Sequence, residues 1–120
     1  MSKIRFAIFG CGVIAGFHAA AIAELEGAEL VACADVYPPA AEKFAAAKNI
    51  RMYPDYDALL AASDVDVVNI CTPSGTHAEL AIKALEAGKN VVLEKPMAIT
   101  VADCDRVIAA AERSRGKITV

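Results

Sequence analysis

Six residues near the N-terminus have the spacing of a phosphate-binding turn. The run Gly10-Cys11-Gly12-Val13-Ile14-Ala15 has the pattern G-x-G-x-x-A, and Gly16 follows it directly. In such a turn the first glycine allows a tight bend from strand to helix. The second glycine has no Cβ and lets a pyrophosphate approach the backbone. Ala15 or Gly16 would let the helix pack closely on the sheet, and the first free N–H groups of the helix would meet the anion. We therefore predict a site for the pyrophosphate of a dinucleotide, the alternative being a glycine-rich turn without a ligand.

An acidic residue follows at the distance that such a site requires. Asp35 lies 20 residues after Ala15, where a carboxylate accepts hydrogen bonds from the hydroxyls of an adenosine ribose. That carboxylate would repel a 2′-phosphate, and Val36, Tyr37 and Pro38 offer no arginine to neutralise one. These residues favour NAD over NADP. The alternative role for Asp35 is to cap the next helix.

Two further residues close to the turn could also do chemistry. Cys11 lies near a helix N-terminus, where the pKa of a thiol is lowered, so a redox role stands beside the role of a small spacer. His18 lies one turn into the same predicted helix. It is either part of the site or a surface or helix-packing residue.

The elements that must position these residues alternate between short apolar runs and longer segments with helical spacing. Predicted strands cover Ile4–Phe9, Glu29–Ala34, Arg51–Tyr53, Val65–Cys71, Asn90–Leu93 and Lys117–Val120. Predicted helices cover Val13–Leu25, Pro38–Lys48, a short segment from Asp55 to Ala62, a segment from Thr76 to Ala87, and one from Thr100 to about Ser114. Near-continuous apolar strands separated by helices are typical of a parallel sheet covered on both faces. Right-handed crossovers then give one doubly wound α/β domain over residues 1–120, with strand order 3-2-1-4-5-6.

Capping residues support three of these helix starts. Asp55 and Thr100 are suited to cap the helices that follow them. Thr76 and Glu79 have the spacing of a capping box, in which the hydroxyl and the carboxylate each satisfy a backbone amide. Gly88 stands where a glycine commonly ends a helix.

The composition excludes several classes of protein. Of the 120 residues 57% are apolar, which is too hydrophobic for an intrinsically disordered chain. No uninterrupted apolar run is as long as a membrane span, and the N-terminus does not have the pattern of a signal peptide. A net charge of −3 gives no basic surface for nucleic acid. The four cysteines are far apart, so we expect reduced thiols in a cytoplasmic protein and no metal site.

Three more segments complete a combination that resembles a known family. Cys71-Thr72-Pro73-Ser74-Gly75-Thr76-His77 ends the fourth predicted strand, Ala84-Leu85-Glu86-Ala87-Gly88-Lys89 closes the next helix, and Glu94-Lys95-Pro96 follows the fifth strand. Together with the glycine turn, they resemble the N-terminal NAD(P)-binding Rossmann domain of the Gfo/Idh/MocA oxidoreductase family. The resemblance covers essentially the whole chain.

The resemblance implies roles for these residues. Thr72 and Pro73 would line the cofactor cleft beside the nicotinamide half. His77 would lie near the dinucleotide, or would only be a neighbour of the helix cap. Lys95 would reach the nicotinamide and the substrate hydroxyl that is oxidised, where a lysine can hold or polarise a developing alkoxide. Without the family pattern, Lys95 would be interpreted as part of a surface ion pair. The family also implies a cis peptide bond between Lys95 and Pro96.

The predicted site has catalytic and cofactor-binding members. The catalytic candidates are Lys95 and, as a weaker one, His77. The cofactor-binding candidates are Gly10, Cys11, Gly12, Val13, Ile14, Asp35, Val36, Thr72, Pro73, Ser74, His77, Glu94, Lys95 and Pro96. Ligands of open α/β sheets bind beyond the carboxyl ends of the strands, where the strand order reverses, and these residues follow such ends.

Two functions are open at this stage. Members of the family carry a second domain that shapes the substrate pocket, supplies an acid/base residue and forms the oligomer interface. We expect this domain to be absent here. Hydride transfer needs a substrate carbon held against the nicotinamide. The chain is then the nucleotide-binding domain of an NAD-dependent oxidoreductase acting on a sugar, polyol or sugar derivative, inactive alone. The alternative is a stand-alone NAD-binding regulatory or sensor module. An apolar face left without its domain would favour a homo-oligomer.

Overall fold

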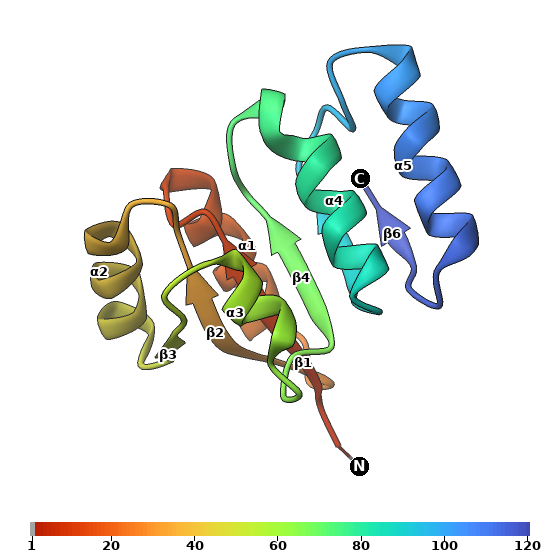
Figure 1. The fold of residues 1–120 in the computed structure, drawn as a ribbon. Helices are drawn as coiled ribbons and strands as arrows, with labels where there is room; N and C mark the ends of the chain where they lie inside the picture. The colour runs from red at the N-terminus through yellow and green to blue at the C-terminus, as the bar shows by residue number, and fades with distance from the viewer. Residues whose placement is uncertain (1) are drawn as a thin grey trace.

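A computed structural model describes residues 2–120, which form a sheet with helices on both faces. The strands are β1 (Ile4–Phe9), β2 (Ala28–Ala34), β3 (Arg51–Met52), β4 (Val67–Ile70), β5 (Asn90–Leu93) and β6 (Ile118–Thr119). The helices are α1 (Val13–Ala23), α2 (Pro38–Lys48), α3 (Tyr56–Ala61), α4 (His77–Glu86) and α5 (Val101–Arg113). All strand pairs are parallel, in the order β3-β2-β1-β4-β5-β6 (Figure 1). The predicted doubly wound fold and its strand order are confirmed.

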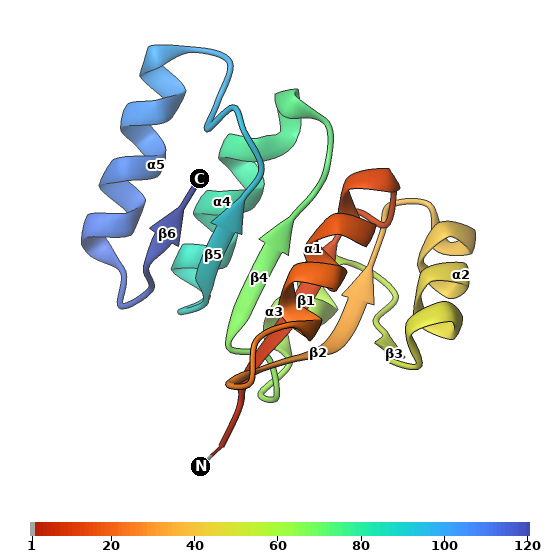
Figure 2. The ribbon, with the colours of Figure 1, turned by 180° about the vertical axis from the view of Figure 1, so that it is seen from behind.

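The helices divide between the two faces of the sheet. Side chains of α1 and α2 pack on one face, and those of α3, α4 and α5 pack on the other. From behind, α1 lies in front of β1 and beside β4, whereas β5 and β6 have no helix in front of them (Figure 2). None of the helices within residues 2–120 is long and apolar enough to cross a membrane.

Two apolar cores result from strands that are buried on both faces. In β1, Ala7 and Phe9 point into the larger core, and Ile8 between them points into the smaller one. Small helix residues such as Ala15 and Ala81 are fully buried against the sheet. The alanine-rich composition therefore allows helices to lie close to the strands.

Most predicted elements are confirmed within one or two residues at each end. The first helix ends at Ala23 instead of Leu25, because Glu24 and Leu25 donate to carbonyls only three residues earlier and tighten the last turn. The regular part of β4 covers Val67–Ile70 and is shorter than the predicted strand. Cys71 nevertheless donates its N–H to the Phe9 carbonyl, so pairing with β1 continues past the strand end.

Two of the three predicted helix caps are confirmed, and one is wrong. Asp55 accepts from the N–H of Ala58 at 2.8 Å, and Thr100 accepts from the N–H of Asp103 at 3.1 Å. The capping box at Thr76 does not form, because a 3-10 turn over Ser74–Thr76 leads directly into α4 and holds Thr76 in a helical conformation. Its hydroxyl donates to the Pro73 carbonyl at 2.6 Å instead.

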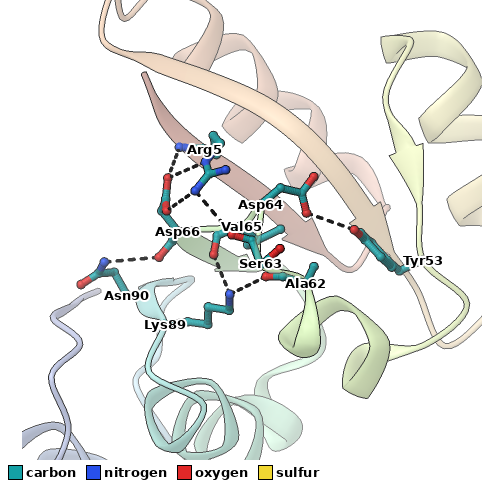
Figure 3. Close-up of polar contacts among 9 residues, drawn as sticks. All are labelled: Arg5, Tyr53, Ala62, Ser63, Asp64, Val65, Asp66, Lys89 and Asn90. Atoms are coloured by element: carbon teal, nitrogen blue, oxygen red, sulfur yellow. Dashed lines mark hydrogen bonds and ion pairs between the residues drawn. The ribbon is translucent and has the colours of Figure 1, made fainter. Parts of the chain in front are cut away.

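Polar contacts tie together the amino ends of the central strands (Figure 3). The guanidinium of Arg5 lies 3.0 Å from the carboxylate of Asp66, and this hydrogen bond holds the pKa of Asp66 below its ordinary value. Nζ of Lys89 donates to the carbonyls of Ala62 and Val65 at 2.7 and 2.6 Å. Burial lowers the pKa of this lysine. These contacts lie at the sheet edge opposite to the predicted site, so they serve the fold.

Candidate functional site

The predicted site residues follow the carboxyl ends of β1, β2, β4 and β5. Since the strands are parallel, these segments meet at one edge of the sheet. A cleft of about 550 Å³ at this edge brings together Asp35 and Val36 after β2 with Thr72 and Pro73 after β4. The glycine turn and the Glu94–Pro96 segment lie outside the lining of this cleft.

The cleft also contains residues that were not predicted to belong to the site, although Asp55 and Thr76 were predicted as helix caps. These are Phe9, Pro54, Asp55, Tyr56, Asp57, Thr76, Leu80 and Lys83. The Tyr56 hydroxyl donates to the Leu80 carbonyl at 2.7 Å, and Lys83 lies 2.6 Å from a carboxylate oxygen of Asp57. These residues come from α3 and α4. Nothing in the local pattern of either segment indicates that α3 and α4 flank one cleft.

The glycine turn has the backbone geometry that its sequence requires. Gly10 has φ +95°, and a Cβ at this position would lie 2.6 Å from the Cys71 carbonyl oxygen. A Cβ on Gly12 would meet no atom within 4 Å, so the space over this residue is open. Ala15 is fully buried against the sheet, whereas the space at Gly16 is open. Ala15 is therefore the residue that allows close packing of the helix.

The N-terminus of α1 is open to an anion. Gly12 is the N-cap residue, and no side chain caps the first turn. The N–H groups in the first turn of a helix have no partner within the helix. Val13 is 85% exposed and Ile14 is partly exposed, so neither covers the turn.

Asp35 joins β2 to the glycine turn. Its Oδ2 accepts from the N–H of Cys11 at 2.7 Å, and its Oδ1 accepts from the N–H of Tyr37 at 2.8 Å. Tyr37, not Asp35, is the N-cap residue of α2, so the alternative role as a helix cap is wrong. Each carboxylate oxygen has a second lone pair, which leaves acceptor capacity for a ribose hydroxyl.

Cys11 is a packed thiol. Its Sγ donates to the Ala34 carbonyl at 3.4 Å. The pKa of Cys11 is raised, first by the neighbouring Cys33 thiol, then by burial and by the negative charge of Asp35. The expected lowering of this pKa by the helix N-terminus is therefore wrong, and the structure favours the role of a small spacer. Cys33 and Cys71 are buried free thiols, as predicted.

His77 connects the loops that follow β4 and β5. Its ring is 1% exposed, with Nδ1 2.7 Å from the Pro96 carbonyl oxygen and Nε2 2.8 Å from the Thr72 carbonyl oxygen. Carbonyl oxygens only accept hydrogen bonds. Both ring nitrogens are thus engaged inside the protein, and contact with a ligand would require His77 to give up one of them.

The Glu94-Lys95-Pro96 segment presents a lysine between two fixed neighbours. The N–H of Glu94 donates to the Ile70 carbonyl at 3.1 Å, which continues the pairing of β5 with β4. The predicted cis bond between Lys95 and Pro96 is confirmed. Lys95 is exposed, and its Nζ takes part in no hydrogen bond or ion pair within residues 2–120.

His18, whose role could not be decided from the sequence, contacts the Glu94-Lys95-Pro96 segment. Its Nε2 lies 2.8 Å from Oε2 of Glu94, and its Nδ1 lies 2.9 Å from Nδ2 of Asn69. His18 is therefore a partner of a predicted site residue and not only a helix-packing residue. Asn69, a single polar residue in an apolar strand, was the available signal.

The arrangement fits a dinucleotide laid along the carboxyl edge. The open N-terminus of α1 would take the pyrophosphate. Asp35 and Val36 would take the adenosine end, and the Glu94–Pro96 segment would lie at the nicotinamide end. Among residues 2–120, His, Cys, Asp and Glu side chains form no group of three that could hold a metal ion.

Comparison with known proteins shows what this chain is similar to. A family model described as an oxidoreductase family with an NAD-binding Rossmann fold matches residues 4–120. The chain is 42% identical over 106 residues to an inositol 2-dehydrogenase of Rhizobium meliloti, covering 88% of this chain and 31% of the relative.

Solved structures show the same fold. The WlbA dehydrogenase of Bordetella pertussis, solved with NADH and UDP-GlcNAcA, aligns with a TM-score of 0.92 at 36% identity, over 98% of this chain and 35% of that one. The biliverdin reductase of Synechocystis, solved with biliverdin and NADP⁺, aligns with a TM-score of 0.88 at 30% identity, over 96% of this chain and 36% of that one. The chain thus spans about a third of the length of the proteins that it matches.

Proposed function

The chain belongs to the Gfo/Idh/MocA oxidoreductase family, and we propose that it is the nucleotide-binding part of an NAD-dependent oxidoreductase acting on a sugar, polyol or sugar derivative. The observation that carries this proposal is the carboxyl edge of the sheet. Asp35 after β2, the open glycine turn after β1 and the exposed Lys95 after β5 follow one another along this edge, in the order of the adenosine, pyrophosphate and nicotinamide of an extended dinucleotide. The reaction is hydride transfer between a CH–OH carbon and the nicotinamide.

We propose NAD as the cofactor in preference to NADP. Both oxygens of Asp35 are held in place by backbone N–H groups, so the carboxylate cannot easily turn away from a ribose. A 2′-phosphate at the same place would meet this negative charge. No arginine follows among Val36, Tyr37 and Pro38. Solved relatives are known with NADH and with NADP⁺, so they do not decide between the two cofactors. Our preference for NAD rests on Asp35.

Lys95 is the residue of this chain that we propose to act on the substrate. The dinucleotide supplies the hydride acceptor when it is bound. The ammonium group of Lys95 would donate a hydrogen bond to the substrate hydroxyl and stabilise the oxygen as its proton passes to the acid/base residue that the family's second domain supplies. We propose for His77 a positioning role through the Pro96 and Thr72 carbonyls, since both of its nitrogens are engaged.

The remaining substrate contacts are proposed to lie outside this chain. The chain matches about a third of the length of its relatives, and Lys95 lies outside the lining of the cleft of about 550 Å³. We therefore expect the 120-residue chain to bind the dinucleotide and to show negligible turnover on sugars or polyols. The exposed side chains of Val13 and Phe17 on α1 are where self-association would begin.

Titration of NADH, followed by its fluorescence, tests the proposal. We expect saturable binding by the wild-type chain and weaker binding by Asp35→Ala. Asp35→Asn, which keeps an acceptor for the N–H of Cys11, should bind NADPH relatively better than the wild type does. The absence of a saturable signal with NADH would refute the cofactor assignment.

Asp66→Ala is a matched control for the Asp35 variants. Asp66 also accepts a backbone N–H, that of Arg5 at 2.8 Å, but it lies at the opposite edge of the sheet. This variant should be less stable than the wild type and bind NADH with unchanged affinity. An equal loss of affinity in the Asp66 and Asp35 variants would mean that lost stability, and not lost contact, explains the weaker binding.

A further inference from the structure

His18 is held between a buried strand residue and Glu94. It lies on α1, its side chain is 15% exposed, and its two ring nitrogens contact Asn69 of β4 and Glu94 after β5. These three residues are far apart in the sequence and come from three different elements. The contact therefore links the helix that follows the glycine turn to the segment that carries Lys95.

The hydrogen bond from His18 to Glu94 has a defined direction. A carboxylate only accepts, so the ring nitrogen facing it, Nε2, carries the hydrogen. Asn69 can donate to Nδ1 through Nδ2 or, with its amide reversed, accept from it. Nε2 donates to Glu94 in either case. This hydrogen bond is the main reason that the pKa of Glu94 lies below its ordinary value.

The contact with His18, and not packing in the core, explains why a polar residue lies at position 69 of this buried strand. Asn69 is 4% exposed in a strand whose other three residues are apolar, and its Oδ1 is buried without a hydrogen-bond partner in residues 2–120. An unpartnered buried oxygen is unfavourable for folding. Within residues 2–120 the side-chain hydrogen bond of this amide is with His18, so Asn69 orients that ring at a cost in stability.

The neighbours of Lys95 are held from two sides. Glu94 is bound through its carboxylate by His18, and Nδ1 of His77 lies 2.7 Å from the Pro96 carbonyl oxygen. The chain has two histidines, and each of them holds one residue next to Lys95. Lys95 itself stays exposed between them.

We propose that His18 is a positioning residue for Lys95, which it serves by fixing the carboxylate of Glu94. This inference rests on the proposed function, in which Lys95 acts at the nicotinamide end. The positive charge of Lys95 already lowers the pKa of Glu94, although less than His18 does. Without His18 the carboxylate is free to turn toward that ammonium and pair with it. His18 thus holds the segment in place and keeps Lys95 available for a ligand.

Two ligands separate this role from a general effect on binding. NADH has a nicotinamide end, whereas ADP has only the adenosine and the diphosphate. We expect His18→Leu to weaken NADH binding by about tenfold or more, which is the value of one lost charge-assisted hydrogen bond. The same variant should bind ADP with the affinity of the wild type. His18→Gln, which can still donate to Glu94, should retain most of the affinity for NADH.

Two further variants complete the design. Arg106→Leu is the control, because Arg106 of α5 also bridges elements, to Glu79 of α4 at 2.7 Å, but lies away from the carboxyl edge. It should leave both affinities unchanged. Lys95→Met should weaken NADH, and adding His18→Leu to it should cause little further loss, because both changes remove the same contact.

Three results would overturn the proposal. These are an unchanged NADH affinity in His18→Leu, an equal loss for ADP and NADH, and fully additive losses in the double variant. If the wild-type chain does not bind NADH, the proposed function fails. Positioning is then judged without a ligand, from the ¹⁵N heteronuclear NOE of the Lys95 amide. This NOE should fall in His18→Leu and stay at the wild-type value in Arg106→Leu. An unchanged NOE in His18→Leu refutes the positioning.

Discussion

Gly10 and Gly12 are two residues apart in one turn, yet a methyl group should have opposite effects at the two positions. At Gly10 a Cβ would lie 2.6 Å from the Cys71 oxygen, where ordinary Cβ contacts begin at 3.4 Å, a shortfall of 0.8 Å (3.4 − 2.6). The atom in the way is backbone and cannot rotate aside. The φ of +95° adds strain for any residue other than glycine. At Gly12 the methyl group meets no atom, and φ −87° is open to alanine.

The expected magnitudes follow from these contacts. A strained φ costs roughly 1–3 kcal/mol and an overpacked contact about the same, so Gly10→Ala should lose about 4 kcal/mol of unfolding free energy. That is a large part of the roughly 5–15 kcal/mol that stabilises a typical domain. It corresponds to a fall in Tm of about 15 °C for a domain of this size. Gly12→Ala should lose less than about 1 kcal/mol, because it only replaces one N-cap residue with a poorer one.

The effect on the cofactor should be reversed. A methyl group on Gly12 fills the space through which the pyrophosphate approaches the backbone, so NADH affinity should fall at least about tenfold, or 1.4 kcal/mol. Thermal and urea unfolding followed by circular dichroism measures stability, and fluorescence titration with NADH measures affinity. An unfolding free energy of Gly10→Ala within about 1 kcal/mol of the wild-type value would refute the claim that Gly10 is needed for the close approach to Cys71. Wild-type NADH affinity in Gly12→Ala would remove the glycine turn from the binding site.

Other predictions concern the stability and reactivity of the fold. Because the hydrogen bond from Arg5 holds the pKa of Asp66 below its ordinary value, this carboxylate stabilises the protein at neutral pH. It loses that contribution as the pH falls from about 4 through its pKa in the folded state, so the difference in urea midpoint between the wild type and Asp66→Asn should narrow over this range. A difference in urea midpoint that stays constant over this pH range would contradict the lowered pKa of Asp66. Thr100→Ala should lower stability by about 1 kcal/mol and speed hydrogen exchange at the Asp103 amide. Thr76→Ala should leave exchange in the first turn of α4 unchanged, because Thr76 does not cap that helix. Burial raises the pKa of Cys71 to about 12, so iodoacetamide at neutral pH should modify it only after unfolding, as mass spectrometry of the peptides would show. Alkylation of Cys71 in the folded protein as fast as that of the half-buried Cys104 would contradict this.

The local pattern of the sequence was sufficient for the fold. Apolar runs of strand length, helical spacing between them and glycines at the turns are properties of neighbouring residues, and they predict the elements within one or two residues. The strand order followed from the general rules of connection between parallel strands. Asp55 and Thr100 act as caps because a cap depends only on the next three residues. The predicted cap at Thr76 is wrong, because a turn that begins at Ser74 gives this residue a helical backbone conformation.

The predicted site divides in the same way. Gly10 and Asp35 could be placed from the sequence, because each directly follows a strand and the carboxyl ends of parallel strands meet at one edge of the sheet. The cleft residues Tyr56 and Lys83 could not be placed, because they come from helices that meet only when α3 and α4 pack side by side on one face of the sheet.

His18 shows most clearly what only the tertiary structure decided. A histidine on a helix has the same local sequence whether it faces solvent or a partner, and its partner Glu94 is 76 residues away. The sequence determined that a strand, a glycine turn and a helix stand at the N-terminus, since local backbone preferences are encoded locally. Only the folding of β4 and β5 beside α1 placed Asn69 and Glu94 on the two nitrogens of one ring, because such contacts depend on side-chain directions across elements that the chain joins only through long connections.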